Sequence, residues 1–152
     1  DRPIAAAAHR PGLTQVLGTM KQSSSDGAIL EMLRISRELV PLLLQGNDPQ
    51  LETLRNQWLV SGLSISQPSA CGFYADISVP ESAQTISAPD QGGGNAEIPV
   101  IGGSHPAGCV LYVVKGRLKF LEVYTTVDWN MPPSFGQPRH IELLQLATGH
   151  GG

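Results

Sequence analysis

The spacing of apolar residues changes at about Gly62, and this change constrains the fold more than any other feature of the chain. Before Gly62, apolar residues recur every three or four positions, as in an amphipathic helix. After it, apolar and polar residues alternate, as in a strand with one buried face. Helices that precede the strands, rather than alternating with them, favour an α+β fold with an antiparallel sheet.

The first helical region contains two expected helices separated by a loop. An apolar stripe predicts a short helix over Leu13–Met20, and Ser23–Asp26 reads as a loop that ends in a capping residue. A second stripe runs from Gly27 to Gly46. Pro41 lies inside it, and we expect a kink or break there because proline cannot donate the helical hydrogen bond.

The residues Asn47-Asp48-Pro49 predict the start of the next helix, because a polar cap is followed by proline in the first turn. Gly62 should end this helix. The short connection makes the two longer helices a helical hairpin, antiparallel or steeply crossed. The expected apolar face of the last helix consists of Leu51, Leu54, Trp58 and Leu59.

Four or five strands are expected after Gly62. Leu63–Gln67 and Cys71–Val79 both alternate. Pro80–Pro99 reads as a flexible loop in which Thr85–Ser87 alone favours a strand. Ile141–Leu146 is interpreted as a strand, with a helix as a close alternative.

Cys109–Val127 is the clearest hairpin, and Lys115-Gly116 is its two-residue turn. Strict alternation from this turn would place Glu122 on the apolar face. A bulge at Phe120-Leu121 would correct this. Such a bulge would turn the side chains of Leu121, Val123 and Val127 inward. It would turn those of Glu122 and Tyr124 outward.

These elements predict an α+β fold in which an N-terminal helical hairpin packs on a four- to five-stranded antiparallel meander. The 152 residues suit one domain. We expect residues 1–22 to form a tail and a short helix, residues 23–148 the single α+β domain, and residues 149–152 a C-terminal tail.

Charge and hydropathy argue against two classes of partner. The net charge is −3, and the basic residues are scattered, whereas nucleic-acid binders carry a basic patch. The longest apolar stretch, Leu39–Leu44, contains Pro41 and is far shorter than the roughly 20 residues of a membrane span. We therefore expect neither a nucleic-acid nor a membrane partner. The cytoplasm is the favoured location, with export as the alternative.

The cysteines and histidines follow no catalytic or metal-binding pattern. Cys71 and Cys109 belong to no C-x-x-C pair, and a disulfide between them is an alternative only if the protein is exported. The histidines have no metal-ligand spacing: they are His9, His105, His140 and His150. The sequence therefore predicts no cofactor, no metal site and no catalytic residue. A small enzyme or toxin effector with a Cys/His site stays open as the alternative function.

One stretch resembles a known group of proteins. Gly116–Tyr124 is similar to a hairpin with the pattern Gly-x-Leu-x-x-Leu-Glu, found in small bacterial proteins of uncharacterised function, and the following Asp128–Pro133 loop is similar as well. Lys115 stands where Asp or Asn is usual. The similarity covers about residues 51–144. Some of these proteins resemble immunity proteins, the partners of secreted toxins, which implies a protein partner.

The resulting hypothesis is a non-enzymatic, small acidic binding protein, of immunity or accessory type, with one bacterial protein partner. The aromatic residues of the Asp128–His140 loop are either a lid packed on the sheet or exposed anchors for that partner. We expect the partner to contact the outer side of the hairpin together with this loop. The candidate residues are Tyr112, Lys119, Glu122, Tyr124, Trp129 and Phe135.

Overall fold

The computed structural model describes residues 16–147, and the side chains from residue 26 onward. The expected N-terminal tail and Leu13, as well as the C-terminal tail, lie outside the described residues. Two helices precede seven strands in this part of the chain. The elements are α2 (Val16–Leu43), α3 (Pro49–Leu59), β1 (Gly62–Ser69), β2 (Gly72–Ser78), β3 (Gln91–Gly93), β4 (Asn95–Glu97), β5 (Gly108–Val114), β6 (Arg117–Tyr124) and β7 (Arg139–Glu142).

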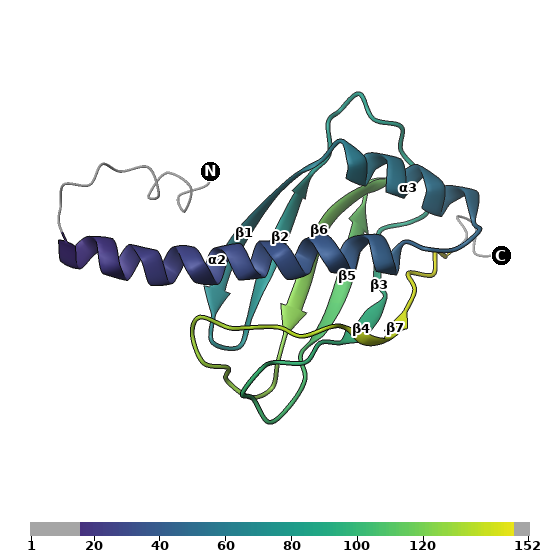
Figure 1. The fold of residues 1–152 in the computed structure, drawn as a ribbon. Coiled ribbons are helices and arrows are strands. Elements are labelled where there is room, and N and C mark those ends of the chain that lie inside the picture. Colours follow the sequence, from purple (N-terminus) through teal and green to yellow (C-terminus); the bar gives the residue numbers. More distant parts are fainter. Residues whose placement is uncertain (1–15, 148–152) are drawn as a thin grey trace.

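The strands form an antiparallel five-stranded sheet and a small second sheet, so the predicted α+β class is confirmed (Figure 1). The order in the large sheet is β1-β2-β6-β5-β3, and β4 pairs with β7 in the small one. This order differs from a meander because the chain crosses to the far edge after β2. It forms β3 and β4 there and then returns through the β5–β6 hairpin to pair β6 with β2.

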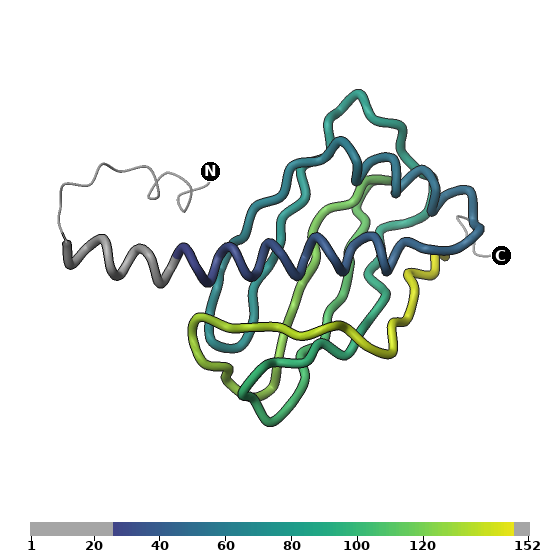
Figure 2. Tube along the Cα trace, viewed as in Figure 1, coloured from purple at the N-terminus to yellow at the C-terminus, as the bar shows by residue number. Residues whose placement is uncertain are grey.

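Both helices cover one face of the large sheet (Figure 1). The core lies between them and the inward side chains of the strands. From α2 it receives Met32, Ile35 and Leu39, each with no exposed surface. From the sheet it receives Phe73, Ala75, Leu111, Leu121 and Val123. Residues 125–147 run along the same side of the sheet as α2 (Figure 2).

The expected loop at Ser23–Asp26 is wrong, because α2 runs without interruption from Val16 to Leu43. Serine weakens a helix only slightly, so this short polar run does not end it. Pro41 interrupts α2 less than expected. It lies in the last turn, where it removes one hydrogen bond, and the backbone N–H of Leu44 still donates to the Val40 carbonyl over 3.1 Å.

The start of α3 is confirmed, but its predicted apolar face is wrong in part. The Asp48 carboxylate accepts a hydrogen bond of 2.8 Å from the Gln50 N–H, and Pro49 is the first helical residue. Leu51 and Leu54 are buried as expected. Trp58 is only partly buried, and Leu59 at the end of the helix is 78% exposed.

Gln57, which was not predicted to be buried, lies on the buried side of α3 with only 2% of its surface exposed. Its Nε2 donates to the carbonyls of Gln84 and Gly116, and its Oε1 accepts from the N–H of Leu118. A buried amide costs little when it is satisfied in this way. Gln57 therefore fixes α3 to the turn of the β5–β6 hairpin.

The Pro80–Pro99 region is more regular than a flexible loop. Its glycine run forms β3, and β4 follows, whereas the favoured Thr85–Ser87 segment is not a strand. The predicted C-terminal strand Ile141–Leu146 is correct only in its first two residues, because β7 begins at Arg139 and ends at Glu142. The rest of this segment is neither strand nor helix.

The β5–β6 hairpin has the predicted turn and a bulge one residue earlier than predicted. Lys115 and Gly116 both have a positive φ, 53° and 76°. Val113 faces Leu118 but Tyr112 faces Phe120, so Lys119 is the extra residue. The bulge turns Leu121 and Val123 inward and Glu122 and Tyr124 outward, as expected. Val127, expected inward, lies beyond the strand and is 41% exposed.

Candidate functional site: the outer face of the sheet

The outer face is the side of the large sheet that points away from both helices. The register places Asp76 opposite Phe120, and Phe120 opposite Tyr112, in one row across the strands. In the next row Tyr74 lies opposite Glu122. Within the described chain, both helices and the 125–147 segment lie on the other side (Figure 1). We define the outer face by seven partly or fully exposed side chains of β2, β5 and β6: Tyr74, Asp76, Val110, Tyr112, Phe120, Glu122 and Tyr124.

Three aromatic rings contact one another across three adjacent strands of this face. The rings of Tyr112 and Phe120 are stacked, with centroids 4.5 Å apart and an interplanar angle of 28°. Tyr74 meets Phe120 edge-on, with centroids 5.4 Å apart and an angle of 79°. Such contacts restrict the rings, so a ligand would meet a largely preorganised surface.

Two glycines on neighbouring strands give the tyrosine rings their space. A Cβ at Gly92 would lie 2.7 Å from the Tyr112 ring, and a Cβ at Gly108 would lie 2.8 Å from the Tyr124 ring. Each tyrosine ring therefore occupies the place that a side chain on the neighbouring strand would need. This packing gives the glycine strand β3 a structural role beside the aromatic cluster.

Carboxylates lie among the aromatic rings. Glu122 accepts a long hydrogen bond, 3.4 Å, from the Tyr112 hydroxyl, which leaves most of its acceptor capacity open. Burial, followed by the negative charge of Glu122, raises the pKa of Tyr112. Asp76 brings a second carboxylate to the same face.

The basic side chains of the hairpin lie toward its turn. Lys119 is exposed at the bulge, and Arg117 donates to the Glu81 carbonyl over 3.0 Å. Acidic and basic groups therefore occupy different ends of β6. Glu122 and Tyr124, predicted as partner-binding residues, lie at the acidic and aromatic end, and Lys119 lies near the turn.

Trp129 and Phe135 do not join the outer face, which corrects the expectation that they would lie beside it. Only 4% of Trp129 and 5% of Phe135 is exposed. Both pack on the inner side against Phe73, each with a centroid distance of 6.4 Å, and they meet each other edge-on at 5.3 Å. The loop is therefore a lid packed on the sheet, the first of the two possibilities that its sequence offered. Burial of its rings removes apolar surface from water.

The lid is fixed at both aromatic positions. The Trp129 indole N–H donates to the Ser69 carbonyl over 3.0 Å. At the other position, the Glu31 carboxylate accepts a hydrogen bond of 2.8 Å from the Phe135 N–H. The Arg34 guanidinium donates a hydrogen bond of 2.9 Å to the Phe135 carbonyl. The hydrogen bond from Arg34 is the main cause that lowers the pKa of Glu31, and the same pairing raises the pKa of Arg34.

The two cysteines have different environments. Cys71 is exposed in the turn between β1 and β2, where its Sγ lies 3.6 Å from the Ser69 hydroxyl. Cys109 is buried, and burial raises the pKa of its thiol to about 12. A thiol with such a pKa is a poor nucleophile at neutral pH. The described residues contain no group of three or more His, Cys, Asp or Glu side chains placed to hold a metal ion.

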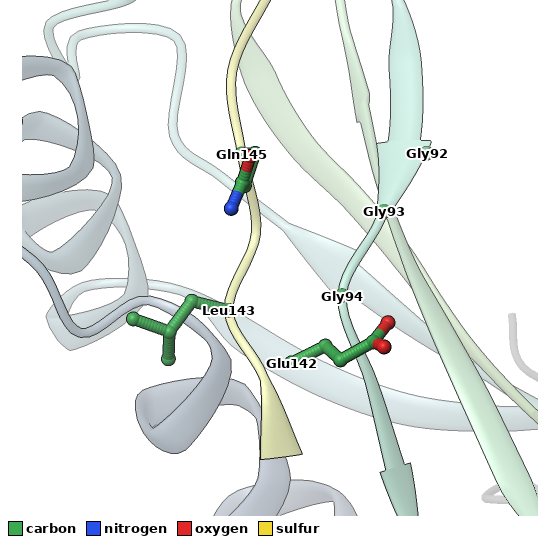
Figure 3. A pocket seen from close by; sticks show the side chains of 6 residues that line it. All are labelled: Gly92, Gly93, Gly94, Glu142, Leu143 and Gln145. Atoms are coloured by element: carbon green, nitrogen blue, oxygen red, sulfur yellow. The ribbon is translucent and has the colours of Figure 1, made fainter.

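The inner edge of β3 borders a shallow hollow of about 550 Å³ (Figure 3). The glycine run forms one wall, and Glu142, Leu143 and Gln145 form the other. Three of its six lining residues are glycines, and Glu142 is its one charged side chain. It offers no aromatic ring, so the outer face remains the stronger candidate.

Comparison with protein-family models, curated proteins and solved structures finds no match for this chain. Among the described residues, no helix is both long and apolar enough to cross a membrane.

Four members of the outer face were not predicted from the sequence as site residues: Tyr74, Asp76, Val110 and Phe120. Alternation in β2 did separate Tyr74 and Asp76 from the buried Phe73, so the signal for these two was present. Phe120 could be placed only with the correct bulge position, because a shift of one residue reverses the face on which a side chain lies.

Proposed function

We propose that this chain is a small acidic protein-binding module, an immunity-type or accessory factor for a bacterial protein partner, that binds through its outer face. The stacked Tyr112–Phe120 pair with Tyr74 at its edge is the observation that carries the proposal. Aromatic residues are enriched at the centres of protein interfaces because they bury much surface at a low cost in side-chain entropy.

The construction of the face supports this proposal. The rings come from three hydrogen-bonded strands, so their backbone positions are fixed before a partner arrives. Polar and charged side chains border the rings, as in a specific interface with an apolar centre and a polar rim. Serines of β1 extend the face on one side, with Ser64 opposite Asp76 and Ser66 opposite Tyr74.

The proposal is tested by comparing what three immobilised forms of the chain retain from an extract of the source organism. The double variant Tyr112→Ala, Phe120→Ala removes the stacked pair. The control, Leu59→Ala, removes an apolar side chain that is 78% exposed at the end of α3. We expect one protein to be retained by wild type and by the control, and lost from the double variant.

Retention of the same proteins by all three forms would show that the outer face is not the binding surface. Crosslinking gives an independent test of where the partner binds: a photo-crosslinking residue is placed at position 124. Tyr124 is 37% exposed at the end of the face, and its crosslinks should map to the same retained protein.

A further inference from the structure

Glu122 is a carboxylate held among aromatic rings. Tyr74 lies directly opposite it on β2, and the Tyr112 hydroxyl lies 3.4 Å from its Oε1 on the β5 side. Phe120 precedes it on the same face of β6. A partly exposed carboxylate with rings on these sides has the elements that recognise an organic cation.

We infer that the outer face binds an arginine side chain presented by a basic, extended segment of the protein partner, with the guanidinium hydrogen-bonded to Glu122 and stacked on the surrounding rings. This inference rests on the proposed function and specifies its ligand chemistry.

Charge complementarity identifies the partner as basic. Glu122 is the carboxylate that would face the bound cation, and the whole chain carries a net charge of −3. The exposed cation of β6, Lys119, lies toward the hairpin turn and repels a ligand cation placed near it. The bound cation should therefore lie at the Tyr74–Glu122 row.

The geometry favours arginine over lysine. A guanidinium is planar, so it can stack on a ring while its N–H groups point at a carboxylate in the same plane. An ammonium group is a more strongly hydrated point charge and gains less from the rings. The face should therefore discriminate between the two cations, which a purely electrostatic surface would not do.

The test is an NMR titration of the full ¹⁵N-labelled chain with the peptide acetyl-Ser-Arg-Ser-Arg-Ser-Arg-Ser-amide. Matched peptides replace all arginines with lysine or with citrulline, which keeps the shape of arginine and removes its charge. We expect shifts at the backbone amides of β2, β5 and β6, weaker binding of the lysine peptide, and binding of the citrulline peptide at least about tenfold weaker than that of the arginine peptide.

Two variants with different expected effects on the affinity for the arginine peptide sharpen the test. Glu122→Gln keeps the shape of the side chain but removes its charge, so the arginine peptide should bind about tenfold more weakly. Lys119→Gln removes a repelling charge, so it should leave the affinity unchanged or raise it. The ¹⁵N spectrum of each variant without peptide reports whether it is folded like the wild type.

Several results would overturn the inference. These are equal binding of the arginine and citrulline peptides, equal binding by wild type and Glu122→Gln, and shifts confined to residues away from the outer face. Binding of a uridine oligonucleotide to this face without binding of the arginine peptide would identify a nucleic acid instead. A dimer formed through the outer face would identify a second copy of the chain.

Failure of this inference can be separated from failure of the proposed function. If a partner is retained in a Phe120-dependent manner but the arginine peptide does not bind, the binding face stands and its ligand chemistry is different. If the retained proteins do not depend on Tyr112 and Phe120, the proposed function itself fails.

Discussion

The sheet carries one aromatic cluster on each side, and neighbouring residues of β2 contribute to both. Phe73 points inward to Trp129 and Phe135, and Tyr74 points outward to Phe120. The inner rings are almost fully buried, and the outer rings are partly exposed. Aromatic side chains of both clusters therefore contact one another in similar ways but differ in exposure, because the lid covers only the inner cluster.

The inner cluster is closed by hydrogen bonds as well as by packing, and the outer cluster is not. The lid backbone is hydrogen-bonded to α2 at Phe135 and to the β1–β2 turn at Trp129, whose N–H donates to the Ala70 carbonyl. On the outer face, the Tyr112 hydroxyl donates a long hydrogen bond of 3.4 Å to Glu122. The comparison predicts that inner substitutions affect mainly stability, and outer substitutions mainly binding.

The largest expected effect is that of Trp129→Ala. It removes a buried ring and its hydrogen bond to Ser69, and we expect the free energy of unfolding to fall by about 3–5 kcal/mol. Urea denaturation followed by circular dichroism measures this loss. A loss below about 1 kcal/mol would mean that the lid does not contribute to the core.

Glu31→Gln should cost about 1–2 kcal/mol, because it weakens a charge-assisted anchor of Phe135 that is partly screened by solvent. Since the native pKa of Glu31 is below its ordinary value of 4.5, its contribution is present above that pH and is lost as the pH falls through the native pKa. The variant should therefore lose less stability than wild type between neutral pH and the acid range.

Glu38→Gln is the matched control for this pH dependence. Glu38 also pairs with Arg34, but Glu31 is the carboxylate that accepts from the Phe135 N–H. Equal pH profiles for wild type and Glu31→Gln, measured by denaturation at several pH values, would contradict the anchoring role.

Phe120→Ala tests the outer cluster, and we expect a loss of only about 1 kcal/mol, because the ring is partly exposed and its contacts with Tyr74 and Tyr112 are the main ones removed. Thermal unfolding measures this loss, and the variant should remain folded while losing the proposed partner. A loss as large as that of Trp129→Ala would remove the distinction between the two clusters.

The smallest effect is expected for Lys119→Gln, within about 0.5 kcal/mol of wild type, because the side chain is exposed at a bulge. Its unfolding curve in urea should overlay that of wild type. A clear loss would show that the bulge depends on this side chain, so that an effect of Lys119→Gln on peptide binding would not report the loss of its charge alone.

The parts of the fold that depend on local chemistry could be predicted from the sequence. Asp48 and Pro49 define the start of α3 through a cap and a fixed φ. The Lys115-Gly116 turn sets the first pairs of the hairpin, and the position of Glu122 requires a bulge in β6. Each of these features depends on residues that are close in the sequence.

The features that could not be predicted depend on distant residues. Gln57 is buried because its amide meets the backbone of Gln84, Gly116 and Leu118, which local periodicity does not reveal. Gly92 is in a strand because its missing side chain makes room for Tyr112. The burial of Trp129 and Phe135 was one of two alternatives for a proline-rich loop, and only the contacts with Phe73 decide between them.

The pairing of β2 with β6 has a consequence for the order of folding. The β1–β2 and β5–β6 hairpins have short turns, and such hairpins form within microseconds. Joining β2 to β6 must also close the long segment that contains β3 and β4, which costs loop entropy and makes this a slower step. The Tyr74–Phe120 contact spans this seam. We therefore expect the three-ring surface to be absent until the two hairpins have joined, so a partner that requires all three rings would bind only chains that have completed this step.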